Sequence, residues 1–471
     1  MYRLLVVVAI VTMACKRERS DSGQQPVVSP PAVQALAFVG DACTKAKQHG
    51  AFAWIEDDYR AALACAKSKN LPLVLDLWAP WCHTCLSMQS TVFTDKSFEQ
   101  DAALFVFAAL DTDRDVNAAA VEQFPLSAWP TFYVVGPDES VLARFVGAAS
   151  VGQFHTFLDA GRRAMAGGVV GADEHLLAAE RHLQANELAD AEQELSAALL
   201  DAPADWSRRP DALVSLIGTK HKLKDVAGCL ALGEKSLDET GNTASASDFL
   251  VHAVGCAAER AKDEPDRVKL LRERAVSRWQ KLVDDPAAPL SVDDRSDAMA
   301  NLRETLEALD NKAAAKATAE KQRVLLDDAA SKAPTPMAAM TYNWPRSEVY
   351  VYLGRPLDLV PALEKSAKEL PTEYDPRARL GWVLFKAGKL DEAVKWTDEA
   401  LKLVYGPRKV RVLGQRADIA NQQGDKPGEK RFRQEIVKTL EALPPSQVQP
   451  EAIAKAKQVV ADLDKPVVAP K

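Results

Sequence analysis

Residues 73–85 read LVLDLWAPWCHTC, and this segment decides the fold of the first part of the chain. It includes most of an apolar run over 71–77 that only Asp76 interrupts, as is typical of a buried strand. Cys82 and Cys85 follow, one helical turn apart, at a separation that suits a disulfide. The segment therefore predicts a strand, a short turn and a helix that begins at a pair of cysteines.

Short apolar runs and helical stretches alternate on both sides of this segment. Further strands are predicted over 104–110, 131–135 and 141–146, and helices over 57–68, 82–89, 116–123 and 151–166. Pro137 and Asp138, between the last two strands, are typical of a tight hairpin turn. This order predicts an α/β domain whose sheet is covered by helices on both faces.

From about residue 171 onward, strand patterns disappear and Ala, Leu, Glu and Lys recur at helical spacing. Small and apolar residues have the spacing of a tetratricopeptide repeat, in which small side chains let paired helices approach closely; they are Gly381, Leu384, Ala393 and Ala400. We expect an all-α helical-repeat domain, with a generic helical bundle as the alternative. Repeats cannot be phased over 205–370, and a loop is expected over 332–344.

The cysteine pair predicts redox chemistry. Cys82 is expected at the N-terminus of its helix, where free backbone N–H groups and the helix dipole favour thiolate over thiol. It is therefore the expected nucleophile. Cys85, one turn further on, is expected to resolve a mixed disulfide by attacking the sulfur of Cys82.

The segment 73–85 resembles the active-site strand, turn and helix of the thioredoxin superfamily, and is most similar to the C-terminal domain of the DsbD thiol:disulfide interchange family. The resemblance continues through the Ala-rich stretch 54–67 and through Trp129-Pro130-Thr131-Phe132, and covers about residues 45–165. It implies a thioredoxin-like fold and a protein thiol–disulfide oxidoreductase that works without a cofactor.

The resemblance also implies roles for Asp76 and Pro130. Asp76 corresponds to the buried acid of thioredoxins, whose pKa burial raises, and which takes the proton from Cys85. The alternative is a carboxylate that reaches water at the end of its strand. Pro130 matches the cis-proline that faces the dithiol and exposes backbone to an extended substrate. Otherwise it is a trans proline that starts a strand.

Four residues around the dithiol are expected to contact substrate: Trp81, His83, Trp129 and Thr131. His83 has two readings, as an imidazolium that stabilises the Cys82 thiolate or as a side chain that points to solvent. The direction of the redox reaction stays open for this reason. Trp129 replaces the smaller residue that is common before this proline, and we expect it to restrict substrate docking.

The N-terminus predicts export. A basic start precedes an apolar run over 4–14 that is too short to span a bilayer, which is typical of a signal peptide. The sequence Thr12-Met13-Ala14-Cys15 resembles a lipoprotein box, so we expect lipidation of Cys15; an ordinary secretory signal is the alternative. The expected location is the bacterial cell envelope, facing the periplasm. The outer membrane is slightly favoured by resemblance to enteric lipoproteins, in which Asp after the lipidated cysteine retains the protein at the inner membrane, because Lys16 holds that position here.

These observations divide the chain. The expected parts are a signal peptide over 1–14, a lipid-anchored flexible linker over 15–35, a thioredoxin-like domain over 36–168, a tetratricopeptide-like helical domain over 169–460 and a disordered tail over 461–471.

The remaining cysteines can form two structural bridges, Cys43 with Cys65 and Cys229 with Cys256, or stay as buried thiols. A metal site is the chemical alternative for the CxxC pair, but structural zinc needs four ligands and no second ligand pair lies near in sequence. We therefore expect no metal and no cofactor.

Charge argues against one class of partner. The formal net charge of -7 is small for 471 residues, and basic side chains are interspersed with acidic ones rather than gathered in a stripe that could follow phosphates. We expect protein substrates, a redox partner protein and a membrane reached through the lipid, and no nucleic acid. Two functions fit: an envelope oxidoreductase whose helical part binds partners, or a non-catalytic helical scaffold with a redox-sensitive module.

Overall fold

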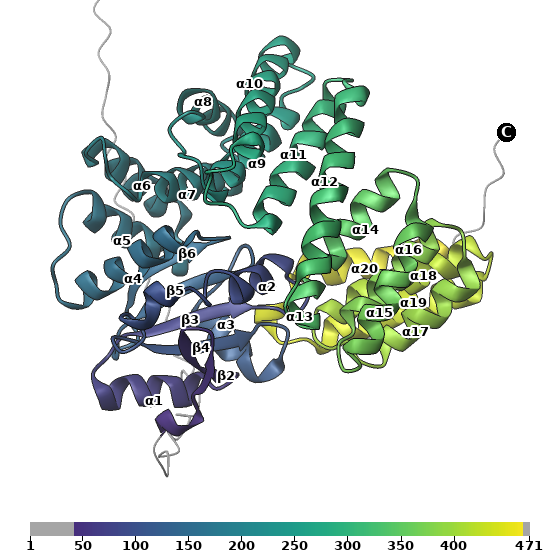
Figure 1. The fold of residues 1–471 in the computed structure, drawn as a ribbon, viewed down its shortest axis with the longest axis horizontal. Coiled ribbons are helices and arrows are strands. Elements are labelled where there is room, and N and C mark those ends of the chain that lie inside the picture. Colours follow the sequence, from purple (N-terminus) through teal and green to yellow (C-terminus); the bar gives the residue numbers. More distant parts are fainter. Residues whose placement is uncertain (1–41, 465–471) are drawn as a thin grey trace, which may run out of the picture. The chain divides into compact units, whose positions relative to one another are not determined.

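The computed structural model describes residues 42–464, which all belong to one unit, Gly40–Lys471 (Figure 1). The predicted signal peptide, Cys15 and the linker lie outside the described residues, as does most of the predicted tail. The last helix continues to Leu463, past the residue at which we expected the tail to begin. Among the helices of residues 42–464, none combines the length and apolar composition that crossing a bilayer requires.

The first part of the chain forms one six-stranded sheet. Its strands, in chain order, are β1 (Lys47–His49), β2 (Phe52–Glu56), β3 (Leu73–Trp78), β4 (Val106–Asp111), β5 (Thr131–Val135) and β6 (Val141–Val146). They lie side by side in the order β1-β2-β4-β3-β5-β6. β3 pairs in parallel with β4 and antiparallel with β5, so the strand that leads into the cysteines is central. Its near-continuous apolar sequence suits a strand buried on both faces.

Helices cover both faces of the sheet. They are α1 (Tyr59–Lys69), α2 (His83–Ser90), α3 (Ala118–Gln123) and α4 (Val151–Met165), with short 3-10 helices at Ala42–Lys45, Lys96–Glu99 and Asp115–Asn117. On one face Phe154 of α4 packs in an aromatic cluster with Phe52, Phe93 and Phe132. On the other face the Ala-rich side of α1 is buried. The sheet therefore has two cores, one on each side.

Sequence patterns located most of these elements. The strands predicted over 131–135 and 141–146 are confirmed at those bounds, and those predicted over 71–77 and 104–110 each start two residues later. Two strands were missed. β1 has only three residues, all exposed, and β2 was too short to stand out beside the Ala-rich helix.

The rest of the described chain is helical, as expected. Its helices are α5 (Ala172–Gln184), α6 (Leu188–Asp201), α7 (Arg209–Lys222), α8 (Val226–Ser236), α9 (Ala244–Glu259), α10 (Pro265–Asp284), α11 (Val292–Ala308), α12 (Lys312–Lys332), α13 (Pro336–Met340), α14 (Asn343–Tyr352), α15 (Val360–Glu369), α16 (Asp375–Lys386), α17 (Leu390–Leu401), α18 (Arg408–Gln422), α19 (Lys426–Ala442) and α20 (Pro450–Leu463), with 3-10 helices η4 (Pro356–Leu359) and η5 (Pro445–Gln447).

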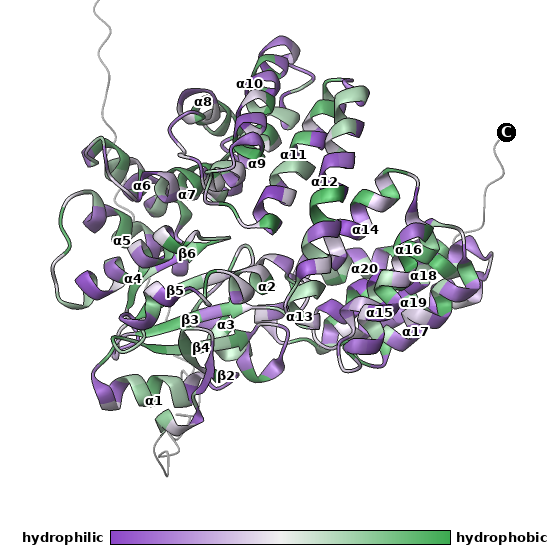
Figure 2. Ribbon diagram, in the orientation of Figure 1, coloured by the Kyte–Doolittle hydropathy of each residue, from purple (hydrophilic) through white to green (hydrophobic). Residues whose placement is uncertain are grey.

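The most extensive helix contacts are between neighbours in sequence, as in stacked helical hairpins. Hydrophobic and hydrophilic residues are mixed along each helix, as Figure 2 shows, so each buries one face against its neighbours. Gly381 has the packing role expected for a small residue, because a Cβ there would overlap the side chain of Thr397 on α17. The loop predicted over 332–344 is wrong in part. It contains α13, whose first turn is capped by Thr335.

The helical region contacts the sheet domain at several places. α5 packs against β6, α11 and α13 pack against α2, and η5 packs against α3. At the first of these contacts, Arg208 and Glu180 form a buried ion pair of 2.7 Å. The second carboxylate oxygen of Glu180 accepts the backbone N–H of Arg144 on β6. The cysteine helix α2 thus lies between the sheet and the helical region.

Candidate active site

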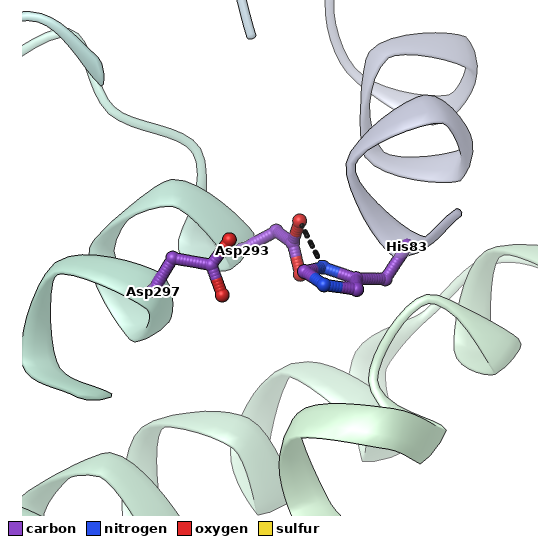
Figure 3. A group of neighbouring side chains, drawn as sticks. All are labelled: His83, Asp293 and Asp297. Carbon is purple, nitrogen blue, oxygen red and sulfur yellow. Dashed lines mark hydrogen bonds and ion pairs between the residues drawn. The ribbon is translucent and has the colours of Figure 1, made fainter. Parts of the chain in front are cut away.

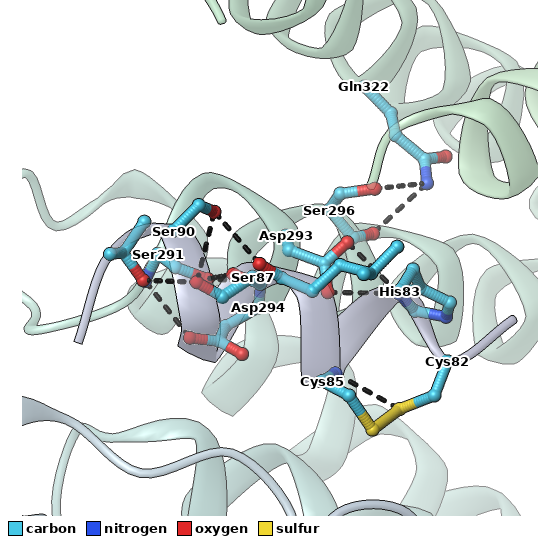
Figure 4. Close-up of polar contacts among 12 residues, drawn as sticks. Cys82, His83, Cys85, Ser87, Ser90, Ser291, Asp293, Asp294, Ser296 and Gln322 are labelled. Carbon is cyan, nitrogen blue, oxygen red and sulfur yellow. Dashed lines mark hydrogen bonds and ion pairs between the residues drawn. A yellow bond between two sulfur atoms is a disulfide. The ribbon is translucent and has the colours of Figure 1, made fainter. Parts of the chain in front are cut away.

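Cys82 and Cys85 form a disulfide at the start of α2, with their Cα atoms 5.2 Å apart (Figure 4). Cys82 is the N-cap residue of the helix, and its sulfur accepts the backbone N–H of Cys85 at 3.0 Å. That N–H and the positive end of the helix dipole would stabilise a Cys82 thiolate after reduction. Both cysteines are buried, at 4% and 1% exposure.

Tryptophans enclose the dithiol. Trp78, Trp81 and Trp129 pack around Ala79 and the two cysteines. The rings of Trp81 and Trp129 meet edge to face, with centroids 5.0 Å apart. Trp81 donates its indole N–H to Asp113, and Trp129 donates its own to Thr112, both at 2.8 Å. These bonds hold both rings in place over the disulfide.

Asp76 lies on β3, between Ala109 of β4 and Phe132 of β5. It is 2% exposed, and its Oδ1 has no hydrogen-bond partner among the described residues. Burial raises the pKa of this carboxyl to about 8. The carboxyl borders a cavity of about 280 Å³, which Pro80 and Leu86 also line. Of the two readings of Asp76, the buried acid is therefore the one that the structure contains.

The peptide bond between Trp129 and Pro130 is cis, as the resemblance implied. Pro130 directly precedes β5, and Trp129 stands beside the dithiol. Thr131, by contrast, is fully buried and donates its hydroxyl to the carbonyl of Ala128. Its expected contact with substrate stays a prediction, as do those of Trp81 and Trp129.

His83 follows neither of the two readings in full. Its Nδ1 lies 2.9 and 3.0 Å from the two carboxylate oxygens of Asp293, at the start of α11 in the helical region (Figure 3). Burial alone lowers the pKa of His83, but the charges of Asp293 and Asp297 outweigh it and raise the pKa to about 10. The ring is therefore an imidazolium at neutral pH, and its charge is paired with Asp293 rather than free to act on Cys82 alone.

The first turn of α11 is held firmly against α2. Ser87 of α2 donates to the hydroxyl of Ser291, which forms a capping box with Asp294. Gln322 of α12 supports α11 from behind by donating to the carbonyl and hydroxyl oxygens of Ser296, as Figure 4 shows. The carboxylate that faces His83 thus belongs to a supported helix end.

His83, Asp293 and Asp297 together offer three ligand atoms within 4.8 Å of one another. The carboxylate of Asp293 is already occupied by the imidazolium, so the group is arranged as an ion pair with a second acid nearby. A second group of this kind, His182, Glu187 and Asp190, lies on the partly exposed turn between α5 and α6.

A groove of about 440 Å³ runs between the dithiol face and the helical region. Thr84, Trp129 and Gly147 line its sheet-domain side. The opposite wall carries the carboxyl groups of α9, α11 and α14, which are Asp248, Asp294, Asp297, Glu304 and Glu348. Burial raises the pKa of Asp248 to about 7 and that of Asp297 to about 8. We call this space the acidic groove.

The other cysteines are paired as well. A disulfide joins Cys43 of the first 3-10 helix to Cys65 of α1, and another joins Cys229 of α8 to Cys256 of α9. Of the two readings for these cysteines, the structure contains the bridges.

Sequence reasoning missed Asp293 and Asp113. The pattern Ser291-Val292-Asp293-Asp294 indicates a helix start, but nothing in it indicates that the helix end meets His83.

Comparison with known families agrees with this geometry. Residues 54–137 match a family model described as thioredoxin-like. The search of curated proteins found no match. Similar solved structures include a tetratricopeptide repeat protein from Parabacteroides merdae, with 13% identity, a TM-score of 0.40, and coverage of 62% of this chain and 98% of that chain. A monomeric mutant of IFIT1 with m7Gppp-AAAA shares 13% identity at a TM-score of 0.34, covering 66% of this chain and 68% of that one. The chain thus carries a thioredoxin-like domain at residues 54–137, followed by a helical region.

Proposed function

We propose that this protein is a thiol–disulfide oxidoreductase of the bacterial cell envelope that exchanges disulfides with protein clients through Cys82 and Cys85. The observation that carries the proposal is the placement of the pair at the N-terminus of α2, beside the cis Trp129–Pro130 bond and directly after the strand that carries a buried acid. A structural disulfide needs neither of these neighbours.

In the reducing direction, the Cys82 thiolate attacks one sulfur of a client disulfide. A mixed disulfide forms, and the client's other sulfur leaves as a thiolate that takes a proton from water. Where Asp76 is ionised, its carboxylate takes the proton from Cys85, and the fraction of molecules in this state grows as the pH approaches about 8. Cys85 then attacks the Cys82 sulfur, so that the client's second thiolate is released. The client gains two electrons, and the Cys82–Cys85 disulfide of the structure is formed. The oxidising direction is the reverse of these steps.

The helical region has two roles in this proposal. It binds the client or a redox partner, and through Asp293 it sets the charge next to the nucleophile. An imidazolium beside Cys82 favours the thiolate, whereas its pairing with a carboxylate weakens that effect. The sequence at Cys15 supports a lipid anchor that keeps the protein at the membrane surface.

The test is a trapping experiment. Cys85→Ser protein, expressed in a bacterial envelope, should accumulate client proteins in mixed disulfides with Cys82, which appear as reducible bands on a non-reducing gel. Cys82→Ser is the matched control, because it removes a sulfur from the same disulfide but lacks the attacking group, and it should trap nothing.

Purified wild-type protein should also reduce or oxidise a model protein disulfide. If Cys85→Ser traps no protein and the wild type shows no exchange in either direction, the proposal is wrong. A helical scaffold with a redox-sensitive module is then the better account.

A further inference from the structure

A second cavity, of about 680 Å³, adjoins the active-site turn on the side of Trp81 and His83. Helices α14, α16, α18 and α19 of the helical region form its remaining walls. Aromatic rings supply much of the lining, from Trp81, Trp344, Trp382 and Phe385. We call this space the basic cavity, because of the charges described next.

Cationic side chains converge on the basic cavity in excess of carboxylates. Arg379 and Arg433 line it, but each is paired, with Asp375 and Asp418 respectively. Three further cations, Lys386, Arg408 and Arg411, form no ion pair with a carboxylate within residues 42–464. The charges of Asp113 and Asp375 still act on Arg408 from further away. Arg408 instead stacks on the ring of Trp81, with its guanidinium carbon 4.4 Å from the ring centroid.

Burial and the neighbouring Arg379 lower the pKa of Arg408 to about 10, so it stays charged at neutral pH. Lys386 and Arg411 lie at the exposed side of the cavity and Arg408 lies deeper, so positive charge exceeds negative charge around this space. An anion inside it would be attracted by all three cations. The cavity size falls in the range typical of ligand sites, roughly 300–1,000 Å³. The geometry therefore calls for a negatively charged occupant.

The acidic groove also borders the active-site turn, with Thr84 and Trp129 in its lining where the basic cavity has Trp81 and His83. A polypeptide that crosses the dithiol meets carboxyl groups where it passes Thr84 and Gly147, and cations where it passes Trp81. The cations attract an acidic stretch, whereas the carboxyl groups offer it no positive charge. The two spaces therefore give a bound chain a preferred direction.

The two segments outside the described residues are not acidic in balance. Residues 1–41 hold four basic and three acidic side chains, and residues 465–471 hold two lysines and no acid. Neither segment therefore offers the basic cavity an acidic stretch.

We propose that the basic cavity binds an acidic segment of the client protein, whose carboxylates pair with Lys386, Arg408 and Arg411 while its disulfide faces Cys82. This inference rests on the proposed function, since it assumes a protein client. Lys386 and Arg411 are exposed and act as the outer contacts, and Arg408, stacked on Trp81, acts as the inner one.

The test uses labelled peptides of equal length without cysteine, one containing four glutamates, one with glutamine in their place and one with lysine in their place. Fluorescence anisotropy measures their affinity for the full chain. We expect the acidic peptide to bind at least tenfold more tightly than the glutamine peptide, and raised salt to weaken it.

The double variant Lys386→Gln/Arg411→Gln should lose about tenfold in affinity for the acidic peptide, because two of the three pairs are gone. The matched control is Lys389→Gln/Lys395→Gln, which removes the same charge from exposed positions outside the cavity. Its affinity should equal that of the wild type.

Equal affinity for the three peptides would overturn the inference, as would an unchanged affinity in Lys386→Gln/Arg411→Gln. So would displacement of the acidic peptide by inorganic phosphate at equal concentration, because the site would then be one for small anions. The peptides lack sulfur, so their binding does not depend on disulfide exchange. A protein that binds them but traps no client refutes the proposed function, and one that exchanges disulfides without charge preference refutes this inference alone.

Discussion

Replacing Asp76 with asparagine should stabilise the protein, and by more at higher pH. The carboxyl has a pKa of about 8 in the folded protein, against 3.8 for an aspartate carboxyl in water. At a pH between 3.8 and about 8, the carboxyl of Asp76 is ionised in the unfolded chain but keeps its proton in the folded protein. The free energy of unfolding therefore falls as the pH rises through this window, and the loss is complete above the folded pKa.

The size of the effect follows from about 1.4 kcal/mol for each pH unit inside the window. For Asp76 the loss is near zero at pH 3, roughly 4 kcal/mol at pH 7 and roughly 6 kcal/mol at pH 9. Asparagine has nearly the same shape and no charge to lose. The stability difference between the Asp76→Asn variant and the wild type should grow along this curve.

Urea denaturation from pH 4 to pH 9 measures the difference, and hydrogen exchange at the amides of Leu75 and Leu77 reports it within β3 itself. Asp205→Asn is the control, because it makes the same chemical change at an exposed position outside both cores. Its stability difference from the wild type should stay small across the range. A gain for Asp76→Asn that is constant with pH would refute the reasoning, since it would come from packing rather than from a buried charge.

Other changes have equally direct readouts. Asp293→Asn should lower the pKa of His83 from about 10, and an NMR titration of the ring measures this change. An unchanged titration would mean that Asp293 does not hold the charge. Since a raised histidine pKa stabilises the fold below pH 6.5 and loses that effect as the pH passes about 10, the same variant should be less stable at pH 7. Glu180→Gln leaves the buried Arg208 with only its longer ion pair, of 3.8 Å, to Asp211, and about 3–5 kcal/mol of the free energy of unfolding should be lost in urea denaturation. Phe154→Ala opens the aromatic core and should lower the same free energy by about 3–5 kcal/mol, whereas a loss below 1 kcal/mol would show that the core refills.

The strand, the cysteine helix and the proline of the site could be predicted from sequence, because each depends on residues that are close together in the chain. An apolar strand, a cysteine that caps a helix and a proline before the next strand all lie within short segments. The same segments led to Cys82, Cys85, Asp76 and Pro130. Their surroundings in the structure, with a buried carboxyl and a cis peptide bond, are those that the resemblance implied.

The partner of His83 could not be read in this way. Asp293 is 210 residues further along the chain, in a region where repeats could not be phased. Without a repeat register, no sequence pattern indicates which helix end meets α2. The basic cavity was missed for the same reason, because Trp81 comes from the sheet domain and Lys386, Arg408 and Arg411 come from two separate helices.

The packing of α5 against the edge strand β6 affects how copies of this protein can meet in concentrated solution. An edge strand with free amides invites a second sheet to join it, which starts aggregation. Here the Glu180 carboxylate accepts a hydrogen bond from the backbone N–H of Arg144, and Arg181 donates one to the carbonyl of Val141. The backbone groups of β6 at these two positions are therefore already paired. At the opposite edge, β1 is only three residues long and fully exposed. Neither rim of the sheet therefore offers a long run of unpaired backbone groups to the sheet of a second copy.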